Sequence, residues 1–200
     1  SNCHVQGSIK GTCSGGIMGG LSGATSYNYS GSQIYNCYNE ASITSTGTSG
    51  VSSTSAISSA GGIVGSLTCS SVLLNKCYNK GSISASSTSS VSQTYAQSGG
   101  IVGKINYSNN GNSWYNQNRI VNCYNTGSVS SLAQYNNPYA TTTPYPKACA
   151  YSGGIVGNMV TKSGNNADYN TISNCYNTGN LSATYYSNHP EAEELKGGIV

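Results

Sequence analysis

Single aliphatic residues recur at fixed distances from a cysteine, with short polar runs between them. One aliphatic position lies three residues before the cysteine, and it is occupied by Ile34, Leu74, Ile120 and Ile172. Another lies six residues after the cysteine, and it is occupied by Ile9, Ile43, Ile83, Val129 and Leu181. A third lies in a Gly-Gly-Ile phrase, at Ile17, Ile63, Ile101 and Ile155. The pattern is an internal repeat with three short apolar anchors in each unit.

Two phrases carry this repeat, and "IVNCYNTGSVS" is nearly copied as "ISNCYNTGNLS". The cysteine phrases lie near residues 1–10, 34–44, 74–84, 120–130 and 172–182. The Gly-Gly-Ile phrases lie at residues 15–19, 61–65, 99–103, 153–157 and 197–200. The segments between the phrases differ in length, so we expect insertions at two corners of the repeat. One corner holds residues 44–60, 84–98, 130–152 and 182–196, and the other holds residues 18–33, 104–119 and 158–171.

The residues of the repeat favour strands and turns. Gly, Ser, Thr, Asn and β-branched residues disfavour helix interiors, and a unit of three short strands cannot bury its apolar positions alone. Stacking the units solves this, because each aliphatic residue then lies on its copy in the next coil. The sequence therefore predicts an all-β fold, in which residues 1–200 form a single right-handed parallel β-solenoid, or β-helix. It has one repeat per coil, about four to five coils, a rise of about 4.8 Å per coil and long corner insertions.

Glycine and asparagine mark the expected turns. The glycines that open "GGIVG" are expected to adopt positive φ and to let neighbouring backbones approach closely. The "NTG" and "NKG" segments are expected to turn the chain, with Asn and Gly in left-handed conformations.

Composition limits the partners of this chain. Only 6% of the residues are charged, and the net charge of +3 comes from scattered lysines and one arginine, so no basic stripe is present for nucleic acid. No apolar run reaches the roughly 20 residues needed to span a bilayer. We expect neither nucleic acid as a partner nor a membrane span.

Five of the eight cysteines occupy one repeat position: Cys3, Cys37, Cys77, Cys123 and Cys175. Stacking would place them in a column at a spacing that permits disulfides, although a buried ladder of thiols fits equally well. In a regular strand the following tyrosine would face the core, whereas a bend at the preceding asparagine would bury the cysteine. We favour the bend, and expect an amide ladder of Asn36, Asn122 and Asn174. With no C-x-x-C pair and only two histidines, neither a metal nor a cofactor is expected.

The pairing of "GGIVG" with I-x-N-C-Y-N-T-G-x-V-S resembles the GLUG repeat. This repeat occurs in bacterial surface proteins, in adhesin-like proteins and in the non-catalytic part of IgA-specific metallopeptidases. The resemblance covers the anchors along the whole chain and implies a secreted or cell-surface location. The first copy departs from the pattern, since His4 stands where the others have tyrosine.

The acidic residues do not form a catalytic set. The chain contains only Glu40, Asp168, Glu191, Glu193 and Glu194. The first two belong to different coils, and the other three share one insertion. Pro190 follows His189, so the H-E-x-x-H motif of metallopeptidases is absent. We therefore predict a non-catalytic protein with no catalytic residues.

Two functions fit these observations. The first is a structural or adhesive extracellular repeat protein, as a rod or filament-forming segment. The second is an adhesin module that binds carbohydrate or a host surface through Tyr- and Asn-rich corner loops. Its candidate contact residues are Tyr27, Tyr29, Trp114, Tyr115, Tyr135, Tyr139, Tyr145, Tyr185 and Tyr186. The sequence begins within one coil and stops within another, so we expect either head-to-tail association of identical chains or membership of a longer array.

Overall fold

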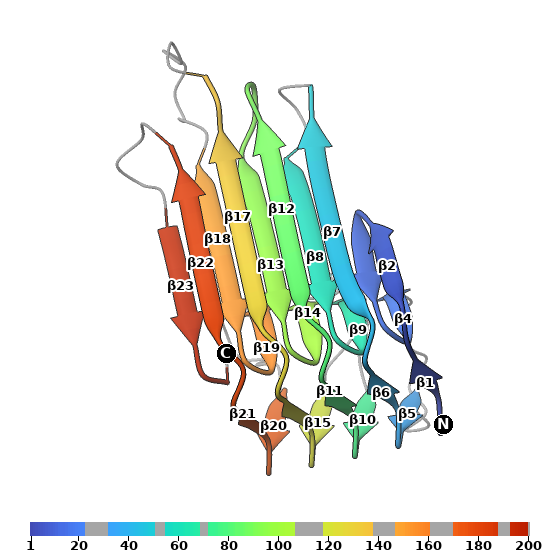
Figure 1. Ribbon diagram of the computed structural model, residues 1–200. Coiled ribbons are helices and arrows are strands. Elements are labelled where there is room, and N and C mark those ends of the chain that lie inside the picture. Colours follow the sequence, from blue (N-terminus) through green and yellow to red (C-terminus); the bar gives the residue numbers. More distant parts are fainter. Residues whose placement is uncertain are drawn as a thin grey trace, which may run out of the picture.

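The computed structural model describes residues 1–22, 32–50, 55–68, 72–106, 118–137, 147–160, 170–187 and 193–199. These residues form strands, turns and bends but no helix, and therefore no helix that could cross a membrane. The strands form five sheets, and every pair of neighbouring strands is parallel (Figure 1). The chain visits the sheets in a fixed order, so each coil contributes one strand to each sheet. The predicted parallel β-solenoid with one repeat per coil is confirmed.

We number the sheets in the order in which one repeat passes through them, starting from β5. Sheet I contains β5 (Gln33–Tyr35), β10 (Leu73–Asn75), β15 (Arg119–Val121) and β20 (Thr171–Ser173). Sheet II contains β1 (His4–Val5), β6 (Tyr38–Asn39), β11 (Tyr78–Asn79), β16 (Tyr124–Asn125) and β21 (Tyr176–Asn177). Sheet III contains β2 (Ser8–Gly11), β7 (Ser42–Ser49), β12 (Ile83–Ser89), β17 (Val129–Tyr135) and β22 (Leu181–Tyr186).

The chain then returns through two further sheets. Sheet IV contains β3 (Cys13–Gly15), β8 (Ala56–Gly61), β13 (Thr94–Gly99), β18 (Ala148–Gly153) and β23 (Glu193–Gly197). Sheet V contains β4 (Met18–Ser22), β9 (Val64–Thr68), β14 (Val102–Ile105) and β19 (Val156–Met159). Each coil therefore has five strands instead of the three predicted.

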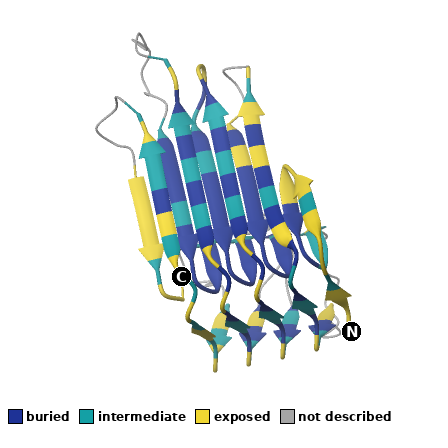
Figure 2. Ribbon diagram, viewed as in Figure 1, coloured by how far each residue is buried: buried dark blue, intermediate teal, exposed yellow. Residues whose placement is uncertain are grey.

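The three aliphatic columns are confirmed by the strand register. Leu74 pairs with Ile34 and Ile120, and Ile83 pairs with Ile43 and Val129. In the Gly-Gly-Ile column, the amide of each isoleucine donates to the carbonyl of its copy in the next coil, at 2.9 to 3.0 Å. The members in the middle coils are fully buried, whereas those of the first and last coils are partly covered, because they lack a coil on one side (Figure 2).

The segments expected to be corner insertions mostly form strands. The described parts of residues 44–60, 84–98, 130–152 and 182–196 supply most of sheets III and IV, which pack face to face around a second hydrophobic cluster. Residues 51–54, 138–146 and 188–192 lie outside the described residues. Their inward positions alternate with outward ones and carry Ser, Ala and Gly. Ser45 Oγ donates to the carbonyl of Ser59 at 2.7 Å, and a Cβ on Gly47 would lie 2.4 Å from the carbonyl oxygen of Ile57. Small inward residues thus let the two sheets approach closely.

The other group of predicted insertions begins in sheet V and ends in sheet I. Their central parts, residues 23–31, 107–117 and 161–169, lie outside the described residues.

The bend in each coil lies directly before the cysteine. Asn36, Asn122 and Asn174 have φ values of 52 to 54°, and Lys76 has a φ of 55° at the equivalent position. This left-handed residue turns the chain between sheets I and II and points the cysteine inward, so the favoured bend is confirmed. The expected positive φ in "GGIVG", "NTG" and "NKG" is wrong, since Gly7 is the one described glycine with a positive φ.

Candidate functional site

Four asparagines form a hydrogen-bonded column where sheet II turns toward sheet III. Asn39 Nδ2 donates to Asn79 Oδ1, Asn79 Nδ2 donates to Asn125 Oδ1, and Asn125 Nδ2 donates to Asn177 Oδ1, each at 2.7 Å. Each Nδ2 also donates, at 2.8 to 2.9 Å, to the carbonyl two residues later in its own coil. Asn39, Asn79 and Asn125 are fully buried. The amides therefore satisfy one another in the interior, where an unpaired amide would be costly.

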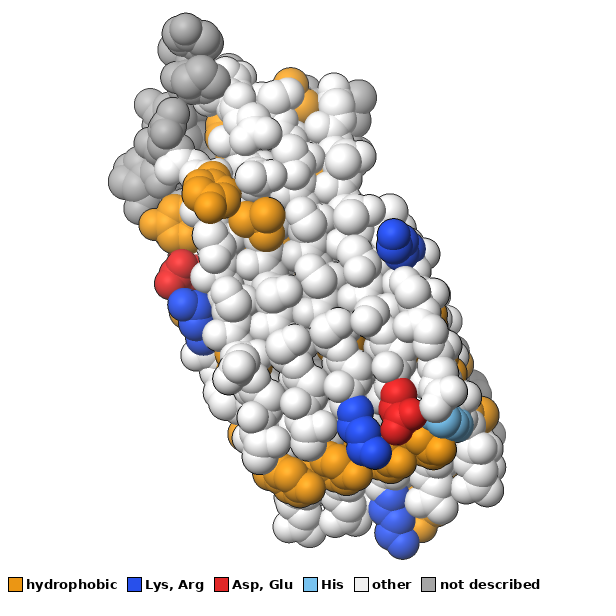
Figure 3. Space-filling view, viewed as in Figure 1, with side chains coloured by type: hydrophobic (Ala, Val, Ile, Leu, Met, Phe, Trp, Pro, Cys, Tyr) orange, Lys and Arg blue, Asp and Glu red, His pale blue; other side chains and the backbone are white. Residues whose placement is uncertain are grey.

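A column of aromatic rings lies beside the asparagines on the outer side of sheet II. His4, Tyr38, Tyr78, Tyr124 and Tyr176 stack on one another with centroid distances of 3.9, 4.7, 4.9 and 5.1 Å. The tyrosine planes lie within 9° of parallel. Because each ring covers the face of the next, the column presents ring edges to solvent. It forms a band of hydrophobic side chains across the coils in Figure 3.

The cysteines lie on the inner side of the same bend. Cys37, Cys77 and Cys123 are fully buried in the first hydrophobic cluster, which also contains the aliphatic residues Leu67 and Leu74. Cys175 of the last coil packs against this cluster. All described cysteines are free thiols, which decides in favour of the thiol ladder. Cys69 lies outside the described residues. Cys37, Cys77, Cys123 and Cys175 thus face the core, and the tyrosine after each faces outward. Cys3 of the first coil is exposed.

The amide ladder predicted one position before the cysteine is only partial. Asn174 Nδ2 donates to Asn122 Oδ1 at 3.3 Å, but Asn122 Nδ2 donates to Asn75 Oδ1 at 3.0 Å. Lys76 stands between Asn36 and Asn122 in this column and interrupts it. The continuous ladder lies three residues further along, at a position that sequence reasoning missed although every "NCYN" or "KCYN" phrase carries an asparagine there.

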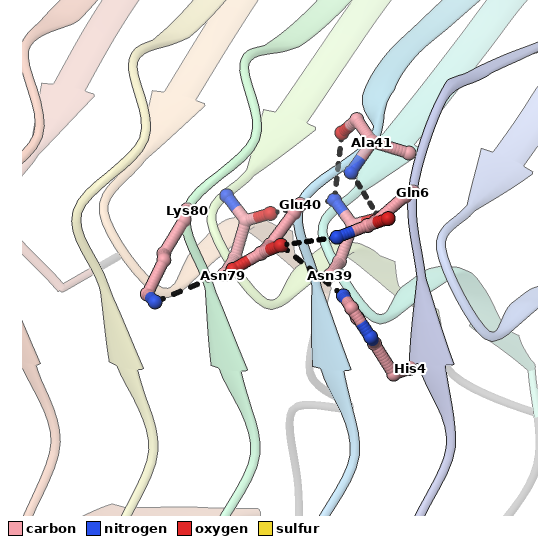
Figure 4. A network of polar contacts seen from close by, with 7 residues as sticks. All are labelled: His4, Gln6, Asn39, Glu40, Ala41, Asn79 and Lys80. Carbon is pink, nitrogen blue, oxygen red and sulfur yellow. Dashed lines mark hydrogen bonds and ion pairs between the residues drawn. The ribbon is translucent and has the colours of Figure 1, made fainter.

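A small charged cluster lies at one end of the tyrosine column (Figure 4). The carboxylate of Glu40 accepts a hydrogen bond from Gln6 Nε2 at 2.9 Å. It also lies 3.2 Å from His4 Nε2 and 3.3 Å from Lys80 Nζ. Lys80 Nζ lies in turn 5.4 Å from the centroid of the Tyr78 ring. The cluster joins side chains of three successive coils through one carboxylate.

Electrostatics in this cluster follow from those contacts. The hydrogen bonds from Gln6 and Lys80, with that of His4, lower the pKa of Glu40. The same carboxylate raises the pKa of Lys80. Burial raises the pKa of Tyr124 within the aromatic column. A carboxylate held ionised by its donors acts as an ionic link between coils.

The candidate contact aromatics are only partly described. Tyr27, Tyr29, Trp114, Tyr115, Tyr139 and Tyr145 lie outside the described residues. Tyr135 is wrong as a contact residue, because only 9% of it is exposed and it packs in the second hydrophobic cluster. Tyr185 is half-buried against the same cluster. Tyr186 is 57% exposed.

The side-chain contacts of this site mainly connect neighbouring coils. Among the described residues no group of three or more His, Cys, Asp or Glu side chains is placed to hold a metal ion. The asparagine and aromatic columns share one feature: their side chains contact the equivalent side chains of the next coil.

The comparisons with known proteins concern the fold. No protein-family model and no curated protein matches the chain. A solved structure from Bacteroides ovatus, described as a "putative immunoglobulin A1 protease", is similar to it with a TM-score of 0.57 and 20% sequence identity. The similarity covers 98% of this chain and 47% of that chain. This chain thus spans about half the length of a protein with which it shares a fold.

Proposed function

We propose that this chain is a non-catalytic rod segment of a secreted or cell-surface bacterial protein, with repeats of the GLUG type. The observation that carries the proposal is the continuous asparagine ladder, in which amides 40, 46 and 52 residues apart hydrogen-bond at 2.7 Å. Such a ladder holds the four coils that it joins in register. The likeness to the Bacteroides ovatus structure supports the fold, and the head-to-tail association of chains stays a prediction.

Mechanical unfolding tests the rod. When the full chain is pulled from its ends, we expect stepwise release of single coils, because each coil contacts only its neighbours. The repeats of 40, 46 and 52 residues would extend by about 140 to 190 Å each. Single-molecule force spectroscopy measures these increments.

The control for this experiment is the variant Asn75→Ala, which leaves the ladder intact and should keep the force of every step. Release of the whole length without measurable resistance would contradict a rod function. So would turnover of a peptide or polysaccharide by the purified chain.

Glycan binding is the second candidate, and the exposure of Tyr186 favours it. Sugar rings pack on a free aromatic face, and the stacked tyrosines of sheet II cover one another's faces. Tyr186 lies on β22, outside that column, next to the half-buried Tyr185.

A matched pair of tyrosine variants tests this candidate on a glycan array. If the chain binds a glycan, Tyr186→Ala should weaken binding by about fivefold, the effect of one aromatic contact. Tyr78→Ala removes a ring whose two faces stack on Tyr38 and Tyr124, and should have no effect. Equal losses in both variants, or no bound glycan for the native chain, would exclude this use of Tyr186.

A further inference from the structure

The cysteines at the repeat position form a regular series, which we call the thiol column: Cys3, Cys37, Cys77, Cys123 and Cys175. Cys3, at the end of the series, is exposed. Each Sγ lies 3.2 to 3.6 Å from the carbonyl oxygen two residues before it. Cys77, Cys123 and Cys175 also lie 3.5 to 3.8 Å from a carbonyl oxygen of the preceding coil. The thiols thus repeat one pose, and neighbouring sulfurs are separated by one coil translation.

The length of that translation can be read from the next residue in the chain. The tyrosines that follow Cys37, Cys77, Cys123 and Cys175 have ring centroids 4.7, 4.9 and 5.1 Å apart. A metal–thiolate bond is about 2.3 Å long, so two such bonds in line span about 4.6 Å. The spacing of the column therefore matches a sulfur–metal–sulfur unit with linear geometry.

The surroundings select the kind of ion. No third His, Cys, Asp or Glu side chain in the described part of the chain completes a larger ligand set. The neighbouring carbonyl oxygens lie at least 3.2 Å from the sulfurs and serve as hydrogen-bond acceptors. Zinc prefers four ligands in a tetrahedron, which these pairs do not offer. Thiolate ligands select soft cations.

We propose that neighbouring thiols of the column bind a soft, linearly two-coordinate d¹⁰ cation, with two thiols for each ion. Two sulfur–metal bonds form and two S–H bonds break, so that M²⁺ and two thiols give a neutral bis-thiolate and two protons. A monovalent ion bound in the same way leaves one negative charge on the complex. Because Cys37, Cys77 and Cys123 are fully buried, where an uncompensated charge is costly, the divalent ion Hg²⁺ is the probe of choice.

Pairing within a series of five thiols sets the number of ions. Five thiols in a row hold two adjacent pairs, with one thiol left over. Loss of the central Cys77 leaves the pairs Cys3–Cys37 and Cys123–Cys175, so two ions still bind. Loss of Cys123 leaves three thiols in a row and an isolated Cys175, so only one ion binds. The capacity therefore depends on which buried thiol is removed.

The test counts Hg²⁺ ions on the full chain by native mass spectrometry, with a small monothiol present to remove singly bound ions. We expect two ions for the native chain, for Cys77→Ser and for Cys13→Ser, which lies outside the column. We expect one ion for Cys123→Ser and none for the double variant Cys37→Ser, Cys123→Ser. X-ray absorption should show two sulfur neighbours for each ion, and Zn²⁺ should not bind.

Equal losses in Cys77→Ser and Cys123→Ser, one sulfur for each ion, or the same occupancy by Zn²⁺ would overturn the proposal. Circular dichroism identifies any variant that fails to fold, and the alanine substitution at the same position then replaces it.

Discussion

Gly100→Ala should prevent the middle coils from stacking and cause a severe loss of stability for the addition of one methyl group. A Cβ on Gly100 would lie 2.1 Å from the carbonyl oxygen of Gly154 and 2.5 Å from the Cβ and Cγ of Asn125. The first atom belongs to the backbone of the next coil and the others belong to the asparagine ladder. Neither the Gly154 carbonyl nor the Asn125 side chain can move away without breaking contacts between coils. We expect a loss of more than about 4 kcal/mol, in the range of severe core disruption.

Thermal unfolding followed by circular dichroism measures this loss, as a fall in Tm of about 10 °C or more for a chain of this size. Gly50→Ala is the matched control, because a Cβ there meets nothing within 4 Å. Its Tm should stay within about 2 °C of the native value. If the two variants were equally stable, the close packing of the Gly-Gly-Ile phrases would be wrong.

Asn79→Ala should destabilise the chain by about 3 kcal/mol, because it opens the middle of the asparagine ladder. The Asn79 side chain donates to Gly81 O at 2.8 Å and to Asn125 Oδ1 at 2.7 Å, and accepts from Asn39 Nδ2 at 2.7 Å. Each of these bonds contributes about 1 kcal/mol, and their loss removes partners from buried amides on both sides. Chemical denaturation of the two proteins measures the difference.

Two further variants, one at Asn75 and one at Asn79, separate the contribution of the ladder's hydrogen bonds from that of side-chain packing. Asn75→Ala lies in the same coil but loses a single exposed bond, of 3.0 Å from Asn122, and should cost less than about 1 kcal/mol. Asn79→Asp keeps the shape of the side chain but replaces the donating amide with an acceptor. It should destabilise the chain at least as much as alanine does. A stable aspartate variant at neutral pH would show that the ladder contributes only packing.

The aliphatic columns were predictable because they lie at constant offsets from the cysteine. A fixed offset in sequence becomes a fixed place in the coil once the units stack, so Leu74 lies between Ile34 and Ile120. The burial of Cys37 could be predicted from the expected bend at Asn36. A left-handed residue reverses the side to which the next side chain points.

The long strands of sheets III and IV were not predictable from apolar periodicity. In β7 the inward positions are Ile43, Ser45 and Gly47, and only the first of these is apolar. The backbones of the two sheets approach closely, so only small residues fit between them. Small residues such as serine and glycine give no apolar periodicity in the sequence. The segments also differ in length between repeats, which is typical of loops and favoured their interpretation as insertions.

The contacts of the candidate site could not be predicted from the sequence, because they join residues that are far apart in the chain. Glu40 meets residues 34 to 40 positions away, and each amide of the asparagine ladder meets one at least 40 positions away. Nothing in the local sequence around Asn79 distinguishes a ladder amide from an ordinary turn residue. The recurrence of asparagine after "CY" was the available signal.

By itself the sequence determined the repeat unit, its parallel stacking and the residues that face the interior at the three anchors, because these depend on offsets within one coil. Only the tertiary structure decided that the intervening segments form two closely packed sheets, and that Asn79 and Glu40 join neighbouring coils. The physical reason is that such hydrogen bonds, and the close approach of backbones around Gly100, exist only after coils far apart in the sequence have stacked in register.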